Sequence, residues 1–134
     1  MKRVRSMLRK VSGFHAATFI IVAVILWLTL APHPVGDRRI FLFPGADKIV
    51  HGIMFFTLAA SYCAEEYILG RLTRIKVWCA AAATMMFGAM TEVLQDRMHI
   101  GRSFEWADIL ADTTGALSAA LLALYFIYKS RSSN

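Results

Sequence analysis

The chain has 134 residues, of which 57% are hydrophobic and 18% are charged, and its mean hydropathy is +0.52. A soluble domain of this length would be about a quarter charged, so the composition indicates one domain with lipid as its solvent. The net charge of +6 does not indicate nucleic-acid binding, because Lys and Arg lie at the ends of apolar segments. The phosphates of a membrane surface are the expected partners for such clusters.

The first apolar segment, residues 14–31, contains eighteen residues without a formal charge. We expect it to form an uncleaved membrane helix. A signal peptide is the alternative, because a basic segment precedes it. The apolar run is longer than a signal peptide usually has, and no good small-x-small cleavage site follows, so the helix is preferred.

Three further spans are expected at about residues 47–69, 75–96 and 104–128. None is purely apolar over its length, so each must take polar residues into the bilayer to cover a core about 30 Å thick. Residues 32–46 contain three prolines and are expected to form an outer loop over the mouth of the bundle. The other connections are short enough to make neighbouring helices antiparallel. The predicted fold is an all-α, polytopic four-helix transmembrane bundle, one domain over residues 1–134.

Charge asymmetry predicts the orientation of this bundle. Ten Lys and Arg residues lie on the side of the N-terminus and five on the opposite side. The excess favours cytoplasmic N- and C-termini, in a multi-pass protein of the cytoplasmic (inner) membrane. The two cysteines, Cys63 and Cys79, have no metal-binding spacing and are expected to be small core residues.

Polar residues of three predicted helices fall in one thin layer near the outer side. A rise of about 1.5 Å per residue puts His51, Glu92 and Asp112 roughly 23–27 Å from the inner ends of their helices. Gln95 and Asp108 lie about one turn further out. Within each helix, spacings of three or four residues put these side chains on one face, so we expect them to point inward together.

The charges of this layer predict a cation. Four acids give −4, and two basic residues give +2: Asp47, Glu92, Asp108 and Asp112 against Lys48 and Arg102. A pocket of low dielectric constant either keeps a carboxylate protonated or binds a divalent cation. An oxygen-rich site of this kind suits Mg²⁺, Mn²⁺ or Ca²⁺ better than zinc.

Each candidate residue has a functional and a structural interpretation. His51 is expected to transfer a proton, with Glu92 and Asp108 as the other catalytic residues; the alternative is a histidine at a helix start, bonded to a carboxylate. Lys48, Gln95 and Arg102 are expected to bind substrate, Arg102 through its two-pronged contact with a phosphate. Alternatively, Arg102 contacts lipid headgroups, Glu92 and Gln95 pair with nearby arginines, and Asp112 forms a structural ion pair.

Glu65 and Glu66 lie close to the cytoplasmic end of their predicted helix, next to Arg71 and Arg74. We expect them to be solvated charges with weak local pairing, and not to form a site.

The same residues carry a resemblance. Asp47-Lys48-x-x-His51, Glu92-x-x-Gln95, Gly101-Arg102, Asp108 and Asp112-x-x-Gly115 occur in an order and spacing similar to those of the VanZ-like family of small bacterial membrane proteins. The similarity runs from Asp47 to the end of the last helix. Asp112 departs from the family, which more often has Asn there. The resemblance implies a role in the cell envelope, and the family's namesake is associated with resistance to the glycopeptide teicoplanin.

The leading hypothesis is a metal-assisted hydrolase or transferase that acts on the headgroup phosphate of a lipid or of a lipid-linked envelope precursor. The alternative is a non-enzymatic protein that binds a lipid headgroup or supports an envelope complex. A small transporter is a third, less favoured hypothesis, because the chain has no inverted repeat and no polar path in its cytoplasmic half. The expected partners are membrane lipids, a second copy of the chain or other envelope membrane proteins.

Overall fold

The computed structural model describes residues 13, 15–31, 45–98 and 104–132, and the regular secondary structure in these ranges is all α-helix. Four helices follow one another along the chain: α2 (Ala16–Leu30), α3 (Ala46–Ile68), α4 (Arg74–Met98) and α5 (Trp106–Ser132). Their ends agree with the predicted spans to within two residues, except that α5 continues to residue 132 and not 128. The predicted outer loop lies outside the described residues except for Gly45 and Ala46, and Ala46 already belongs to α3.

Local sequence explains where α3 begins and ends. Gly45 precedes the helix with φ 85°, a left-handed conformation that glycine adopts at little cost. Asp47 lies in the first turn, where a negative charge is favourable. Gly70, with φ 71°, follows the helix, and its amide donates to the carbonyl of Tyr67. The link to α4 is therefore short, and α4 runs back alongside α3.

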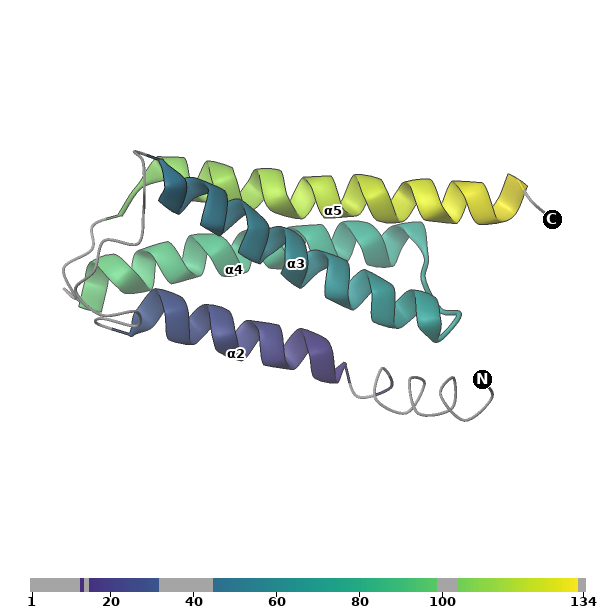
Figure 1. Cartoon of the computed structure of the whole chain (residues 1–134), viewed down its shortest axis with the longest axis horizontal. Helices are drawn as coiled ribbons and strands as arrows, with labels where there is room; N and C mark the ends of the chain where they lie inside the picture. The colour runs from purple at the N-terminus through teal and green to yellow at the C-terminus, as the bar shows by residue number, and fades with distance from the viewer. Residues whose placement is uncertain (1–12, 14, 32–44, 99–103, 133–134) are drawn as a thin grey trace.

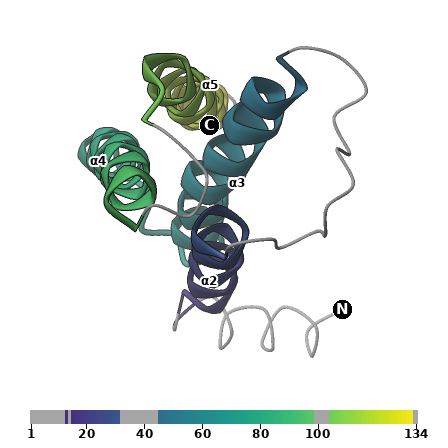
Figure 2. The same cartoon turned by 90° about the vertical axis from the view of Figure 1, so that its left-hand side faces the viewer.

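The helices alternate in direction along the long axis, so the start of α2 and the end of α5 lie at the same end of the bundle (Figure 1). An end-on view places α3 between α2 and α5 (Figure 2). Helix α5 packs on α3 and α4, whereas α2 packs on α3 and α4 but not on α5 within the described residues. Helix α2 is thus attached to one side of a three-helix unit.

Small side chains form much of the core. One cluster joins α3, α4 and α5 and consists of Cys63, Val77, Ala81, Ala120, Ala123 and Ile127. A second cluster joins α2 to α3 through Ile25, Phe55 and Leu58. Alanine at these positions lets the helices approach closely, as is typical of helices packed in membranes.

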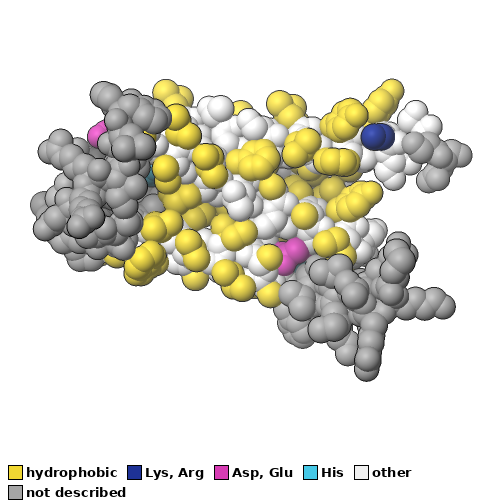
Figure 3. Space-filling view, in the orientation of Figure 1, with side chains coloured by type: hydrophobic (Ala, Val, Ile, Leu, Met, Phe, Trp, Pro, Cys, Tyr) yellow, Lys and Arg dark blue, Asp and Glu magenta, His cyan; other side chains and the backbone are white. Residues whose placement is uncertain are grey.

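The surface is apolar where a soluble protein would be polar. Hydrophobic side chains are spread over the visible face between the two ends (Figure 3). The exposed large hydrophobic residues of the described part include Phe19, Ile53, Ile75, Met86, Leu110 and Leu121. In contrast, His51, Glu65, Glu66, Glu92, Gln95 and Asp112 are buried. This distribution is the one expected of a bundle surrounded by lipid.

Two helices, α4 and α5, are long and apolar enough to cross a membrane. Helix α2 is apolar, but its 15 residues reach only about 22 Å, short of a hydrocarbon core of about 30 Å. Helix α3 is long enough and carries charged residues near both ends. The structure therefore confirms that the described part of the chain is all-helical and contains two candidate membrane spans. The four-span arrangement and its orientation stay predictions.

The contact between α3 and α5 sets the geometry of the polar residues near it. A Cβ atom added to Gly115 would lie 2.2 Å from the carbonyl oxygen of Gly52 and 2.9 Å from the amide nitrogen of Phe56. These distances are far inside van der Waals contact, so only glycine allows the two backbones to be this close. His51 adjoins this contact on α3, and Asp112 lies one turn away on α5.

Candidate functional site

His51 and Asp112 form a buried pair between α3 and α5. Nδ1 of His51 lies 3.0 Å from Oδ1 of Asp112, and the two residues are only 7% and 1% exposed. Gly88 on α4 leaves room for the carboxylate, because a Cβ there would lie 2.7 Å from Asp112 Oδ2. A hydrogen bond at one ring nitrogen orients the ring and leaves the other nitrogen, Nε2, available for chemistry.

Asp108 lies on the Nε2 side of the His51 ring, and Glu92 is close to both residues. Nε2 is 3.9 Å from Oδ2 of Asp108. Glu92 is completely buried; its Oε2 accepts the amide N–H of Glu105 at 3.3 Å, and its Oε1 has no hydrogen-bond partner among the described residues. One ligand atom each of His51, Glu92 and Asp108 lies within 4.8 Å of the other two. An imidazole nitrogen and two carboxylate oxygens at this spacing can hold a divalent cation.

Lys48 occupies the centre of a second group of acids, at the N-terminal end of α3. Its Nζ lies 2.6 Å from Asp47 Oδ2, 2.5 Å from Glu105 Oε2 and 3.0 Å from Asp108 Oδ1. Asp47, Glu105 and Asp108 also have ligand atoms within 4.8 Å of one another. Asp108 therefore belongs to both groups, and the ammonium group predicted to contact substrate is engaged by three carboxylates.

Negative charge is in excess in these two groups. Together with Asp112 they contain five acids and Lys48, which gives −4 with a neutral His51: Asp47, Glu92, Glu105, Asp108 and Asp112. Glu92 and Asp112 are buried and Asp108 is nearly so, whereas Asp47 and Glu105 are partly exposed. Burying the uncompensated charge of the first three is unfavourable, so a cation or protons must balance part of it. Arg102, predicted to bind phosphate, lies outside the described residues.

Three sequence-predicted residues have a different environment from the one expected. Gln95 is buried, and its Nε2 donates to the carbonyl of Thr29 at 2.8 Å, so it joins α4 to α2. Asp112, expected among the metal ligands, pairs with His51 and orients it. Asp47 pairs with Lys48 and belongs to the group with Glu105 and Asp108, not to the group with His51 and Glu92. Glu105, to which the sequence reasoning gave no role, belongs to the second acidic group and contacts Glu92 through its amide.

A second buried polar cluster lies at the opposite end of α3, and here the sequence prediction is wrong. Glu65 and Glu66 are 4% and 2% exposed, so they are not solvated. Glu65 accepts the amide N–H of Ala17 at 3.0 Å and the hydroxyl of Thr18 at 2.7 Å. It therefore caps the first turn of α2, which has no capping side chain of its own at His15.

Glu66 forms ion pairs with Arg71, at 2.8 Å, and with Lys76, whereas Arg74 was the predicted second partner. Both glutamates lie within 3.4 Å of a ring nitrogen of His15. One signal for the burial of Glu65 was present in the sequence: it is 14 residues, about four turns, from His51, on the same buried stripe of α3.

The cysteine prediction is half wrong, since Cys63 is buried and Cys79 is exposed.

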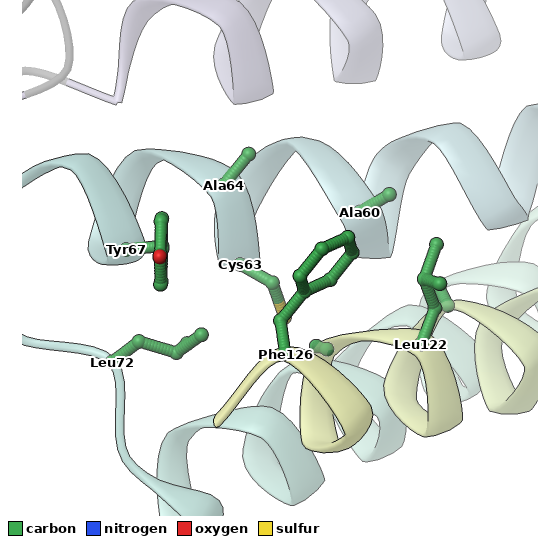
Figure 4. A pocket seen from close by; sticks show the side chains of 9 residues that line it. Ala60, Cys63, Ala64, Tyr67, Leu72, Leu122 and Phe126 are labelled. Carbon is green, nitrogen blue, oxygen red and sulfur yellow. The ribbon is translucent and has the colours of Figure 1, made fainter. Parts of the chain in front are cut away.

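Two cavities of the described part have mainly apolar linings that do not include His51. One, of about 270 Å³, lies between α3 and α5 and is lined by Ala60, Cys63, Ala64, Tyr67, Leu72, Ala119, Leu122, Ala123 and Phe126 (Figure 4). The other, of about 440 Å³, is bounded by α2, α3 and α4. Neither lining includes a charged residue.

Comparisons with known proteins find no matching family model, no matching curated protein and no matching solved structure. The function therefore has to be argued from the site itself, and not from the fold, which is shared by proteins of many activities.

Proposed function

We propose that the chain is a VanZ-like integral membrane protein of the bacterial cytoplasmic membrane, with all four helices in the bilayer and both termini in the cytoplasm. The apolar exterior and the buried ionisable residues support this arrangement. The shorter α2 is accommodated by its polar contacts to Glu65 and Gln95 at its two ends. The acidic end of α3, α4 and α5 then faces the outer leaflet.

The proposed activity is chemistry at the phosphate of a lipid headgroup or of a lipid-linked envelope precursor. The observation that carries it is Glu92, a fully buried carboxylate with one oxygen unpartnered among the described residues, grouped with His51 and Asp108. An anionic phosphate would be repelled by this excess of acid alone. A divalent cation held by the acids, together with Arg102, would reverse the sign of the field that the phosphate meets.

His51 is the proposed acid–base group. Asp112 holds Nδ1, so that Nε2 can remove the proton from a water or acceptor hydroxyl as its oxygen bonds to phosphorus. The bond from phosphorus to the leaving oxygen then breaks, and that oxygen takes the proton back from His51. Water as the attacking group makes the protein a hydrolase, and an acceptor hydroxyl makes it a transferase.

The test uses purified protein in lipid nanodiscs made with an envelope lipid extract, Mg²⁺ and ³¹P NMR. We expect new phosphate signals with wild type, loss of these signals with His51→Ala and retained lipid binding by that variant. Thr114→Ala, on the exposed face of α5, is the matched control and should behave as wild type. Unchanged turnover in His51→Ala would exclude the proposed role of His51.

The second candidate is non-enzymatic binding of a lipid headgroup or of an envelope partner. The specific observation in its favour is the engaged state of Lys48, since an acidic site with its ammonium already paired attracts a cationic headgroup. It predicts lipid binding without turnover. Transport is less favoured, because the apolar cluster of Ile25, Phe55 and Leu58 separates the two polar ends of the bundle.

A further inference from the structure

We propose that the acidic centre is built for two adjacent cations, of which one is a divalent metal ion and the other is the protein's own Lys48. Glu92 and Asp108 hold the metal ion beside the ring of His51, and the ammonium group of Lys48 fills the second position, between Asp47, Glu105 and Asp108. The carboxylate of Asp108 is shared by the two positions. This inference deepens the proposed function, on which its catalytic meaning rests.

The first position is defined by two carboxylates and one unsatisfied group. Ligand atoms of Glu92 and Asp108 lie within 4.8 Å of each other and of a ring nitrogen of His51. Two carboxylates at this spacing, together with water, can hold a divalent cation. Glu92 is completely buried and its Oε1 has no partner among the described residues. Asp112 is hydrogen-bonded to Nδ1 of His51, so Nε2 stays free beside this position for the proposed proton transfer.

The second position has the ligands of a metal site and is occupied by nitrogen. Three carboxylate oxygens surround Nζ of Lys48 at 2.5 to 3.0 Å. The same three residues satisfy the spacing of a cation site on their own. An ammonium group supplies the positive charge without vacant coordination positions, so it cannot polarise a phosphoryl oxygen as a metal ion does.

The shared carboxylate links the two positions. Oδ1 of Asp108 faces Lys48 at 3.0 Å, and Oδ2 faces Nε2 of His51 at 3.9 Å. Enzymes with two metal ions commonly use them as a clamp on the attacking and leaving oxygens of a phosphate. Here Lys48 would replace one half of that clamp with a fixed charge, so the centre should bind one metal ion per chain. Removing the ammonium group should open the second position to a metal ion.

Metal stoichiometry of the full-length protein in detergent, measured by EPR titration with Mn²⁺ alone, tests this inference. We expect one bound Mn²⁺ in wild type, two in Lys48→Gln with magnetic coupling between them, and one in Lys48→Arg. Lys76→Gln is the matched control, since Lys76 pairs with the buried Glu66 at the other end of the bundle; it should bind one ion. Glu92→Gln should weaken binding at the first position more than tenfold, by analogy with the roughly 10–100-fold lost even when a supporting contact to a ligand is removed.

Two results would overturn the inference separately. A single Mn²⁺ in a folded Lys48→Gln protein, checked by circular dichroism and gel filtration, would show that Lys48 does not occupy a metal position. Wild-type binding that is absent, or unaffected by Glu92→Gln, would exclude the first position. The Mn²⁺ titration contains no lipid, so its result does not depend on whether the protein acts on lipids. A protein that binds Mn²⁺ as expected but shows no lipid turnover would contradict the proposed function and not the metal position.

Discussion

Gly115→Ala should separate α3 from α5 and damage the polar centre from a position that contributes no polar group to it. The added Cβ would lie 2.2 Å from the carbonyl oxygen of Gly52, whereas ordinary contact begins near 3.4 Å, so the helices must part by about 1.2 Å. The His51–Asp112 hydrogen bond, now 3.0 Å, lies within one turn and would be lost. Overpacking and this lost bond outweigh the better helix propensity of alanine, and we expect a net destabilisation of roughly 2–5 kcal/mol.

Gly52→Ala is the matched control on the opposing helix. A Cβ at Gly52 meets only the carbonyl oxygen of Ala111, at 3.5 Å, which is ordinary contact. This variant should be as stable as wild type or up to about 1 kcal/mol more stable. Both proteins would be unfolded in mixed micelles of increasing SDS fraction and followed by far-ultraviolet circular dichroism. Equal midpoints for the two variants would refute the close backbone contact and the position of the centre beside it.

Three further predictions follow from the rest of the bundle. Glu65→Ala should destabilise the protein by about 1–2 kcal/mol in the same assay, because the start of α2 loses its hydrogen-bond acceptor. Thr57→Ala, at an exposed position of α3, should not destabilise it. Equal effects of the two substitutions would contradict the cap. A small apolar maleimide should label Cys79 in detergent and leave Cys63 unlabelled until the protein unfolds; equal rates would contradict the difference in burial. In a cysteine-free background, Glu105→Cys and Ser132→Cys should react with an impermeant maleimide from opposite sides of the membrane, and reaction from one side would contradict the proposed topology.

The positions of the helices were predictable from the sequence because they depend on local quantities. Apolar length, the prolines of residues 32–46 and the glycines beside helix ends are all visible in the chain. The common depth of His51 and Asp112 was predictable for a similar reason, since the rise of a helix is constant. Their approach to 3.0 Å also requires the close contact of α3 and α5 at Gly115.

Contacts between helices distant in the chain were not predictable in the same way. Glu65 is buried because α2 begins over the end of α3, and no local pattern states which helix covers that face. Asp112 meets His51, and Glu105 meets Lys48. Which carboxylate meets which partner depends on the rotation of α5 about its axis and on the path of the chain just before it, and neither is visible in the sequence.

The most direct test of the proposed chemistry compares the lipids of cells that lack the protein, cells with wild type and cells with Glu92→Gln at equal abundance in the membrane. We predict that one phosphate-bearing lipid or lipid-linked precursor changes in amount in the deletion strain and by the same amount in the Glu92→Gln strain. A Glu92→Gln strain with the lipids of wild type would contradict a reaction at this buried carboxylate.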